Sequence, residues 1–175
     1  MSDTRAPDAV HVRDARPDER AAVRALTLRA YGEYATVMSP TTWAGLDQAI
    51  RAALDGDGPC ERIVAECAGA LVGSVMLFPP ATEAYGSLTA HVPWPELRVL
   101  AVAPDARGLG VGQALVQECA RRARASGAVV LGLHSSRSMA AALRMYARLG
   151  FVREPAHDFV PEGGEVVEGY RLDLE

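Results

Sequence analysis

The sequence is 175 residues long, with 49% apolar and 23% charged residues, which is typical of a single globular domain. Its formal net charge of −4 argues against nucleic acid as a partner, because phosphate backbones bind basic surfaces. No apolar run reaches the roughly 18 residues of a membrane span, and residues 1–9 are too polar for a secretion signal. We therefore expect no membrane partner, a cytoplasmic location, a flexible lead-in over 1–9 and one domain over 10–175.

The reactive residue types restrict the chemistry further. The cysteines are odd in number and widely spaced, which predicts free thiols at Cys60, Cys67 and Cys119 and no disulfide framework. No pair of histidines has the spacing of metal ligands, so we expect no metal. The chain has no lysine, which excludes Schiff-base chemistry.

The first half of the chain predicts helices and strands separated by Gly- and Pro-rich breaks. Pro17 marks the start of the first helix, and the Asp55–Pro59 stretch ends the second one. The expected order is strand 10–14, helix 17–31, loop 32–40, helix 41–54, a hairpin of strands 62–67 and 71–78, and a long loop over 81–95.

The second half predicts a strand over 97–102, a Gly-rich turn and a helix that ends near Ser126. A strand over 129–134, a helix over 139–149 and two final strands over 151–154 and 166–173 follow. Because strand, helix and strand follow one another between 97 and 134, we expect a parallel pair with a right-handed crossover. The hairpin implies antiparallel neighbours, so the fold class is α/β with a mixed sheet flanked by helices.

The junction from strand to glycine turn to helix is an anion-binding design. Glycines let the backbone approach an anion closely, and the helix N-terminus points unpaired N–H groups at it. Arg107 adds a charge whose fork geometry suits phosphate oxygens. A P-loop is excluded because it needs a lysine, and the G-x-G-x-x-G dinucleotide pattern fails at its third glycine. The pattern present is R-x-x-G-x-G, formed by Arg107, Gly110 and Gly112.

Two stretches carry a family resemblance. The first is L-x-V-A-P at Leu100–Pro104 followed by D-A-R-G-L-G-V-G, and the second is A-L-R-M-Y-A-R-L-G-F at Ala142–Phe151. Together with the element order they resemble the GCN5-related N-acetyltransferase (GNAT) superfamily along nearly the whole chain. The resemblance implies the acyl-CoA N-acyltransferase fold, with a mostly antiparallel sheet, one splayed parallel strand pair, and acetyl-CoA as cosubstrate.

The resemblance also assigns residues to acetyl-CoA. The pantetheine arm would bond to the strand backbone, the glycine turn would hold the pyrophosphate, and a serine after the next strand would bond the pantetheine amide or cap the following helix. These positions are Leu100, Ala101 and Val102 on the strand, Arg107, Gly108, Leu109, Gly110, Val111, Gly112 and Gln113 at the turn, and Ser135.

Two residues are candidates for proton transfer in the attack of an amine on a thioester. Glu96 opens the strand where the family often places a general base, although it would otherwise be an ordinary solvated residue. Tyr146 stands where the family places a general acid, and a phenol with a pKa near 10 can protonate a departing thiolate. Core packing is the other interpretation of Tyr146, since it shares a helix face with apolar neighbours.

The acceptor side is less defined. The family shapes this pocket with loops that correspond here to 32–40 and 80–95, where the candidates are Glu33, Tyr34, Tyr85, His91 and Trp94. The predicted activity is acetyl transfer to a primary amine, either of a small molecule or of a peptide N-terminus. A coenzyme-A-binding sensor without catalysis is the alternative, and a homodimer is left open because many relatives pair through sheet edges.

Overall fold

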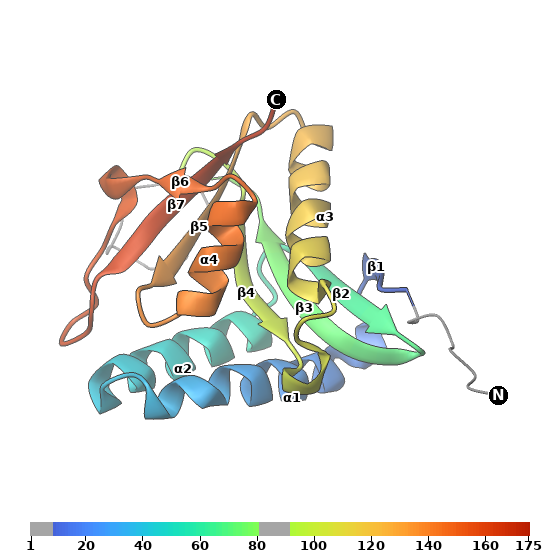
Figure 1. Cartoon of the computed structure of the whole chain (residues 1–175), viewed down its shortest axis with the longest axis horizontal. Coiled ribbons are helices and arrows are strands. Elements are labelled where there is room, and N and C mark those ends of the chain that lie inside the picture. The colour runs from blue at the N-terminus through green and yellow to red at the C-terminus, as the bar shows by residue number, and fades with distance from the viewer. Residues whose placement is uncertain (1–8, 81–91) are drawn as a thin grey trace.

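A computed structural model of the chain describes residues 9–80 and 92–175 (Figure 1). The predicted flexible lead-in falls almost entirely outside these residues, and so do the acceptor candidates Tyr85 and His91. Across the described ranges, no helix is both long enough and apolar enough to cross a bilayer.

The N-terminal part forms strand β1 (His11–Asp14), helix α1 (Arg20–Tyr31) and helix α2 (Pro40–Asp55), with short 3-10 helices η1 (Pro17–Glu19) and η2 (Gly32–Thr36). The predicted loop after α1 is therefore partly helical. Helix α2 begins at Pro40 and is capped by Ser39, whose Oγ accepts the N–H of Thr42 at 3.2 Å. The sequence analysis placed the start of this helix at residue 41. Serine followed by proline at the first helical position explains the earlier start.

The remaining elements follow the predicted order closely. They are β2 (Glu61–Cys67), β3 (Ala70–Phe78), β4 (Glu96–Val102), η4 (Pro104–Ala106), α3 (Val111–Ala125), β5 (Val130–Ser136), α4 (Ala140–Arg148), β6 (Val152–Arg153), η5 (Pro155–His157) and β7 (Val167–Asp173).

These strands form one seven-stranded sheet in the order β1-β2-β3-β4-β5-β7-β6. Every neighbouring pair is antiparallel except β4 and β5, which are parallel and meet only where Glu96 pairs with Gly132. The N–H of Gly132 also bonds to the Pro95 carbonyl at 2.9 Å, and beyond this point β4 and β5 diverge (Figure 1). The mixed sheet with one splayed parallel pair confirms the predicted fold class.

Helices cover both faces of the sheet. Gly73 and Ser74 are adjacent in β3, so they face opposite sides. A Cβ at Gly73 would lie 2.6 Å from Val111 of α3, whereas the Ser74 hydroxyl lies 3.2 Å from the hydroxyl of Thr27 on α1. Helix α2 packs on the α1 side, where Ile50 and Leu54 form a cluster with Met76 of β3. Helices therefore cover both faces of β3, and β4 parts from β5 beyond the single pairing of Glu96 with Gly132.

Candidate active site

Strand β4 is bent where it leaves β5. Ser74 pairs with Ala101 and Met76 pairs with Arg98, so Val99 and Leu100 together oppose a single residue of β3. This is a β-bulge, and Val99 has a φ of +54°. A β-branched residue in the left-handed region costs about 1–3 kcal/mol and persists only where its surroundings enforce it. The strained residue lies beside the splayed gap, and strained backbone is often found at functional sites.

The β3–β4 ladder determines which backbone groups of β4 face the gap. Ala103 donates its N–H to the Val72 carbonyl at 2.8 Å, and backbone directions alternate along a strand. Ala101 therefore turns its N–H and C=O toward β3, while Leu100 and Val102 turn theirs toward β5. Of the three predicted backbone contacts, only Leu100 and Val102 have polar groups directed into the gap.

The glycine turn leads into the N-terminus of α3. Gly108 and Gly110 have φ values of +82° and +79°, a conformation that glycine adopts without steric cost. Gly110 is the N-cap of α3 and no side chain caps this end, so the first N–H groups of the helix stay available. Gly112 is buried, and a Cβ there would lie 3.0 Å from Met145 Sδ of α4.

The side chains around this turn have different environments. Leu109 and Gln113 are exposed, whereas Val111 is packed into the core. Val111 can therefore contact a ligand only through its backbone. The turn presents exposed backbone on a rigid helix start, which fits an anion such as a pyrophosphate.

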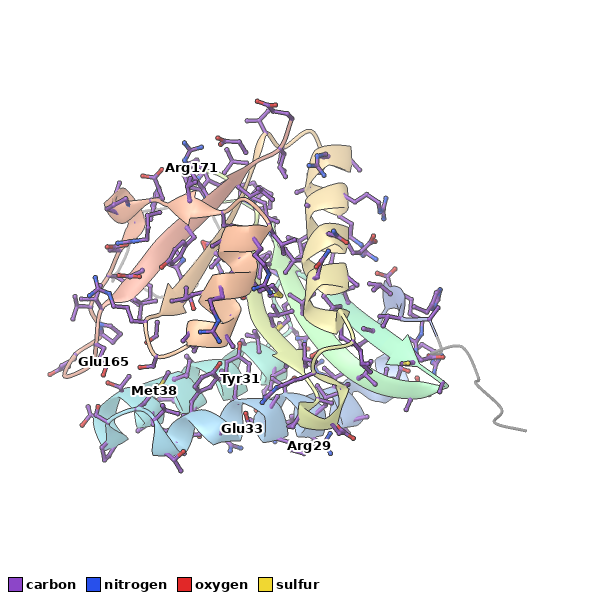
Figure 2. All side chains as sticks on the ribbon, viewed as in Figure 1. Arg29, Tyr31, Glu33, Met38, Glu165 and Arg171 are labelled. Carbon is purple, nitrogen blue, oxygen red and sulfur yellow. The ribbon has the colours of Figure 1, made fainter. Side chains whose placement is uncertain are left out.

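Arg107 is bound to Glu33, with 2.6 Å between Nη1 and Oε2. The side chains are 48% and 51% exposed, so the ion pair is a weak one that solvent screens. Glu33 lies on η2 at the C-terminal end of α1, close along the chain to Tyr31 (Figure 2). The predicted pyrophosphate ligand and a predicted acceptor residue are thus in direct contact.

Tyr146 lies on α4 and is buried, with its ring 5.6 Å from that of Phe151. Burial raises the pKa of Tyr146 well above its usual value, and the phenol of Tyr34 acts in the same direction. Burial also raises the pKa of Tyr34, which lies near Arg107 and 5.9 Å from Tyr31 between ring centres. Burial therefore keeps the phenol of Tyr146 protonated across the physiological range.

Glu96 is only 1% exposed, so the alternative of a solvated residue at the strand start is wrong. Its Oε1 lies 3.0 Å from Nδ1 of His134 on β5 and 3.6 Å from Nε of Arg98. The other nitrogen of His134, Nε2, lies 2.8 Å from the carbonyl oxygen of His157. A strand-start carboxylate is buried here because the neighbouring parallel strand supplies a partner.

His134 was not recognised as a site residue in the sequence. Gly132 pairs with Glu96 across the sheet, so His134, two residues further along β5, presents its side chain on the same face. Finding it from the sequence would have required the register of the parallel pair, since a shift of one residue places the imidazole on the opposite face.

Trp94 packs over β5 beside this carboxylate. A Cβ at Gly132 would lie 2.2 Å from the indole Nε1 and 3.3 Å from Glu96 Cγ, so glycine is what lets the indole lie there. The indole also makes an edge contact with His157, at 5.0 Å between ring centres. Trp94 therefore covers Glu96 from the β5 side.

Ser135 is buried and its hydroxyl donates to Met139 Sδ at 3.5 Å. The turn before α4 is instead stabilised by Ser136, whose Oγ accepts the N–H of Ser138 at 3.2 Å. Ser135 does not cap the helix, so its predicted contact with pantetheine is the interpretation that stays open.

The sequence analysis also predicted free thiols at the three cysteines and no bound metal. All three cysteines are free thiols: Cys60 and Cys67 are half-buried, and burial raises the pKa of Cys119 to about 12. Within the described part of the chain, no group of three or more His, Cys, Asp or Glu side chains is arranged to hold a metal ion.

Comparisons with known proteins agree with this geometry. A GCN5-related N-acetyltransferase from Rhodopseudomonas palustris has a TM-score of 0.69 and 21% identity, over 97% of this chain and 99% of that one. A GNAT family acetyltransferase from Brucella melitensis, solved with acetyl-CoA, has a TM-score of 0.59 and 23% identity, over 96% and 90%. The ribosomal-protein-S18-alanine N-acetyltransferase from Escherichia coli has a TM-score of 0.63 and 18% identity, over 95% of each. At these identities the likeness shows the fold.

The mixed sheet, with its splayed parallel pair beside a glycine turn, has the architecture of an acyltransferase fold. The sequence profile of the Acetyltransferase (GNAT) family matches residues 22–151, about three quarters of the chain. This chain therefore belongs to the GNAT acetyltransferase family. A comparison with curated proteins found no match.

Proposed function

We propose that this chain is an N-acetyltransferase that moves an acetyl group from acetyl-CoA to a primary amine, by direct attack while both are bound. The observation that carries the proposal is the gap between β4 and β5. It has a buried carboxylate, Glu96, where the strands part, and an exposed glycine turn at the other end of β4. Tyr146 on α4 supplies a protonated phenol.

The donor side fits the residues present. The backbone groups of Leu100 and Val102 that face the gap match the amides of a pantetheine arm. The open N–H groups at the start of α3 match a pyrophosphate, and Arg107 adds a charge once it leaves Glu33. Acetyl-CoA supplies an activated thioester whose carbonyl carbon accepts the amine. The Brucella melitensis relative was solved with acetyl-CoA, which supports the same donor here.

The protein's part in the reaction is to move two protons. An amine is an ammonium ion at neutral pH, and it must lose a proton before its nitrogen can attack. Glu96 takes that proton, the N–C bond forms and the C–S bond breaks. Tyr146 then gives its proton to the departing thiolate, because its raised pKa keeps the phenol protonated until a strong base forms. The second proton that the nitrogen loses as it becomes an amide restores the phenol, so the net products are the amide, the thiol of coenzyme A and one proton on Glu96.

The acceptor is a primary amine, carried either by a small molecule or by a peptide N-terminus. The Escherichia coli relative acts on the alanine of a ribosomal protein, which keeps protein N-termini among the candidates. Glu33 and Tyr34 on η2 and Trp94 over β5 are the described residues that we assign to this side.

The experiment is release of free coenzyme A from acetyl-CoA against a panel of polyamines, amino acids, aminoglycosides and short peptides. We expect release with at least one amine, and we expect Glu96→Gln to lower kcat by about 10²-fold or more with an unchanged Kd for acetyl-CoA. If the kcat of Glu96→Gln stayed near that of the wild type, Glu96 would not be the general base. Thermal stabilisation by acetyl-CoA with no release from any amine would favour a coenzyme-A-binding sensor instead.

A further inference from the structure

We propose that His134 is a positioning residue for the base: its imidazolium holds Glu96 ionised through Oε1 and leaves Oε2 to receive the proton of the acceptor amine. The inference rests on the proposed function, in which Glu96 is the base. It adds a residue that neither the family motifs nor the sequence analysis identified, and it divides the work between the two oxygens of Glu96.

The hydrogen bonds of His134 define where its protons lie. Nε2 is 2.8 Å from the His157 carbonyl oxygen, and a carbonyl can only accept, so Nε2 carries a hydrogen. Nδ1 is 3.0 Å from Glu96 Oε1. At that distance a hydrogen must lie between them, held either by the imidazole or by the carboxyl. The pair is therefore either imidazolium with carboxylate or imidazole with carboxylic acid.

Charged neighbours decide between these two states. Burial by itself favours the neutral form, because both charges are removed from water. Arg98 lies 3.6 Å from Oε1, and a cation at this distance favours the carboxylate. On the other side Asp158 accepts the N–H of Gly169, the residue that pairs with His134, and Arg153 holds the pKa of this carboxyl at about 2. An anion there favours the imidazolium.

Within residues 9–80 and 92–175, the other neighbours of the pair are aromatic rings and His157, whose carbonyl binds His134 Nε2 and whose ring contacts Trp94. The ring of Phe159 lies 5.4 Å from that of His134, and the guanidinium of Arg98 lies 4.3 Å from the centre of the Phe78 ring. Trp94 covers Gly132 next to Glu96. An apolar wall excludes water and strengthens the two charge contacts that favour the ion-pair state.

The second oxygen of Glu96 provides the place for the acceptor. Oε2 is buried and has no hydrogen-bond partner among residues 9–80 and 92–175. An unsatisfied buried oxygen costs roughly 1–3 kcal/mol, which an ammonium N–H would recover on binding. The structure therefore points to a cationic primary amine as the group that Oε2 binds.

The proton step balances within this arrangement. The ammonium donates one proton to Oε2 and becomes a neutral amine, while the bond from Nδ1 to Oε1 stays in place. The positive charge passes from the amine to the Glu96–His134 pair, so the net charge of the site does not change. The neutral nitrogen is then free to attack the thioester carbonyl carbon.

The first test is a pair of His134 variants read by the pH dependence of kcat/KM for the acceptor. His134→Ala removes the charge and both bonds, and we expect the acidic limb to move up by about 1–3 pH units. His134→Asn keeps a neutral donor near the Nδ1 position, so we expect a smaller shift and partial recovery of turnover at pH 7. The Kd for acetyl-CoA stays within twofold in both variants.

The control is His11→Ala, which removes an exposed histidine from the far edge strand β1. We expect its pH profile to match that of the wild type. An acidic limb that stays in place in His134→Ala overturns the proposal, since a merely structural role would change the amount of folded enzyme and leave the profile where it was.

The second test needs no acceptor and no variant of His134. Nitrogen NMR of the wild-type imidazole rings distinguishes imidazolium from neutral imidazole. We expect both nitrogens of His134 to be protonated at pH 7, and we expect Glu96→Gln to convert the ring to the neutral form. A neutral ring in the wild type at pH 7 would place the shared proton on Glu96 and overturn the proposal. The NMR result does not depend on whether any amine is acetylated. It therefore tests the His134–Glu96 ion pair separately from the proposed acetyltransferase activity.

Discussion

Tyr146 is a core residue for which we propose a second role as proton donor. It packs against Phe151 inside the main core cluster, and the same burial raises its pKa. A carboxylic acid in that place would have to be protonated against its ordinary pKa, whereas a buried phenol stays protonated across the physiological range. The two interpretations from the sequence are therefore compatible, and a substitution that conserves the ring separates them.

Tyr146→Phe removes the hydroxyl and keeps the ring. We expect kcat to fall by about 10²-fold or more, because the thiolate loses its donor, with little change in Tm. Steady-state kinetics with a saturating amine measures kcat, and thermal unfolding measures Tm. The matched control is Tyr170→Phe on β7, whose hydroxyl donates to Glu168 at 2.7 Å outside the splayed gap. Equal turnover in the two variants would leave Tyr146 with a packing role alone.

At the scale of elements, the proposed active site depends on one point of contact between β4 and β5. The strands pair only at Glu96 and Gly132, and Trp94 fits over Gly132 because it has no Cβ. On the other side of that contact the bulge at Val99 bends β4. The same short region thus defines the gap and places the buried carboxylate.

Gly132→Ala tests this contact, since its Cβ would lie 2.2 Å from the Trp94 indole and 3.3 Å from Glu96 Cγ. We expect a loss of about 1–3 kcal/mol in the free energy of unfolding and a fall in kcat/KM for the amine. Urea denaturation measures the free energy of unfolding, and initial rates at several amine concentrations measure kcat/KM. Gly58→Ala is the control, because nothing lies within 4 Å of its Cβ. If both alanines behaved alike, packing at Gly132 would not support the site.

At the scale of the molecule, arginine ion pairs join elements that are distant in sequence. Arg13 of β1 binds the distant Glu66 as well as the nearby Glu19, and Arg122 of α3 binds Asp14 and Glu61. With no lysine in the chain, every such cation is a guanidinium, which can bond two carboxylates at once. The arrangement lowers the pKa of Glu19 to about 2, mainly through its hydrogen bonds to Arg13.

Stability should therefore fall at acid pH. Glu19, Glu118 and Asp158 each have a pKa of about 2 in the folded chain, below their ordinary values of 4.5, 4.5 and 3.8. A lowered carboxyl pKa contributes stability that is complete above the unfolded pKa and is lost as the pH falls through the folded one. We expect Tm to decline between pH 4.5 and pH 2.

The variant Arg13→Gln checks the cause of that decline. It removes the largest cause of the lowered pKa of Glu19 and leaves the contacts with Arg16, so we expect a lower Tm at pH 7 and a smaller fall between pH 4.5 and pH 2 than in the wild type. Thermal unfolding followed by circular dichroism across this range measures both. A fall as large as that of the wild type would show that Glu19 does not contribute to it.

Much of the fold could be predicted from local signals. The hairpin of β2 and β3, the glycine turn before α3 and the parallel pair follow from breakers, periodicity and the crossover rule. The misses were local as well, such as the Ser39 cap and the short helix η2 in a predicted loop. Site residues were harder to predict, because the direction of a backbone group or a side chain depends on strand pairing: Ala101 turns its polar groups toward β3, and His134 was not identified. Tyr85 and His91 lie outside the described residues and stay predictions.

The sequence by itself determined the element order, the family and the position of the glycine turn before α3, because each depends on residues close together in the chain. Only the tertiary structure decided that Glu96 is buried, that His134 holds it, and that Arg107 meets Glu33. These contacts join residues 38 and 74 positions apart. They depend on strand register and helix packing, which no local pattern contains.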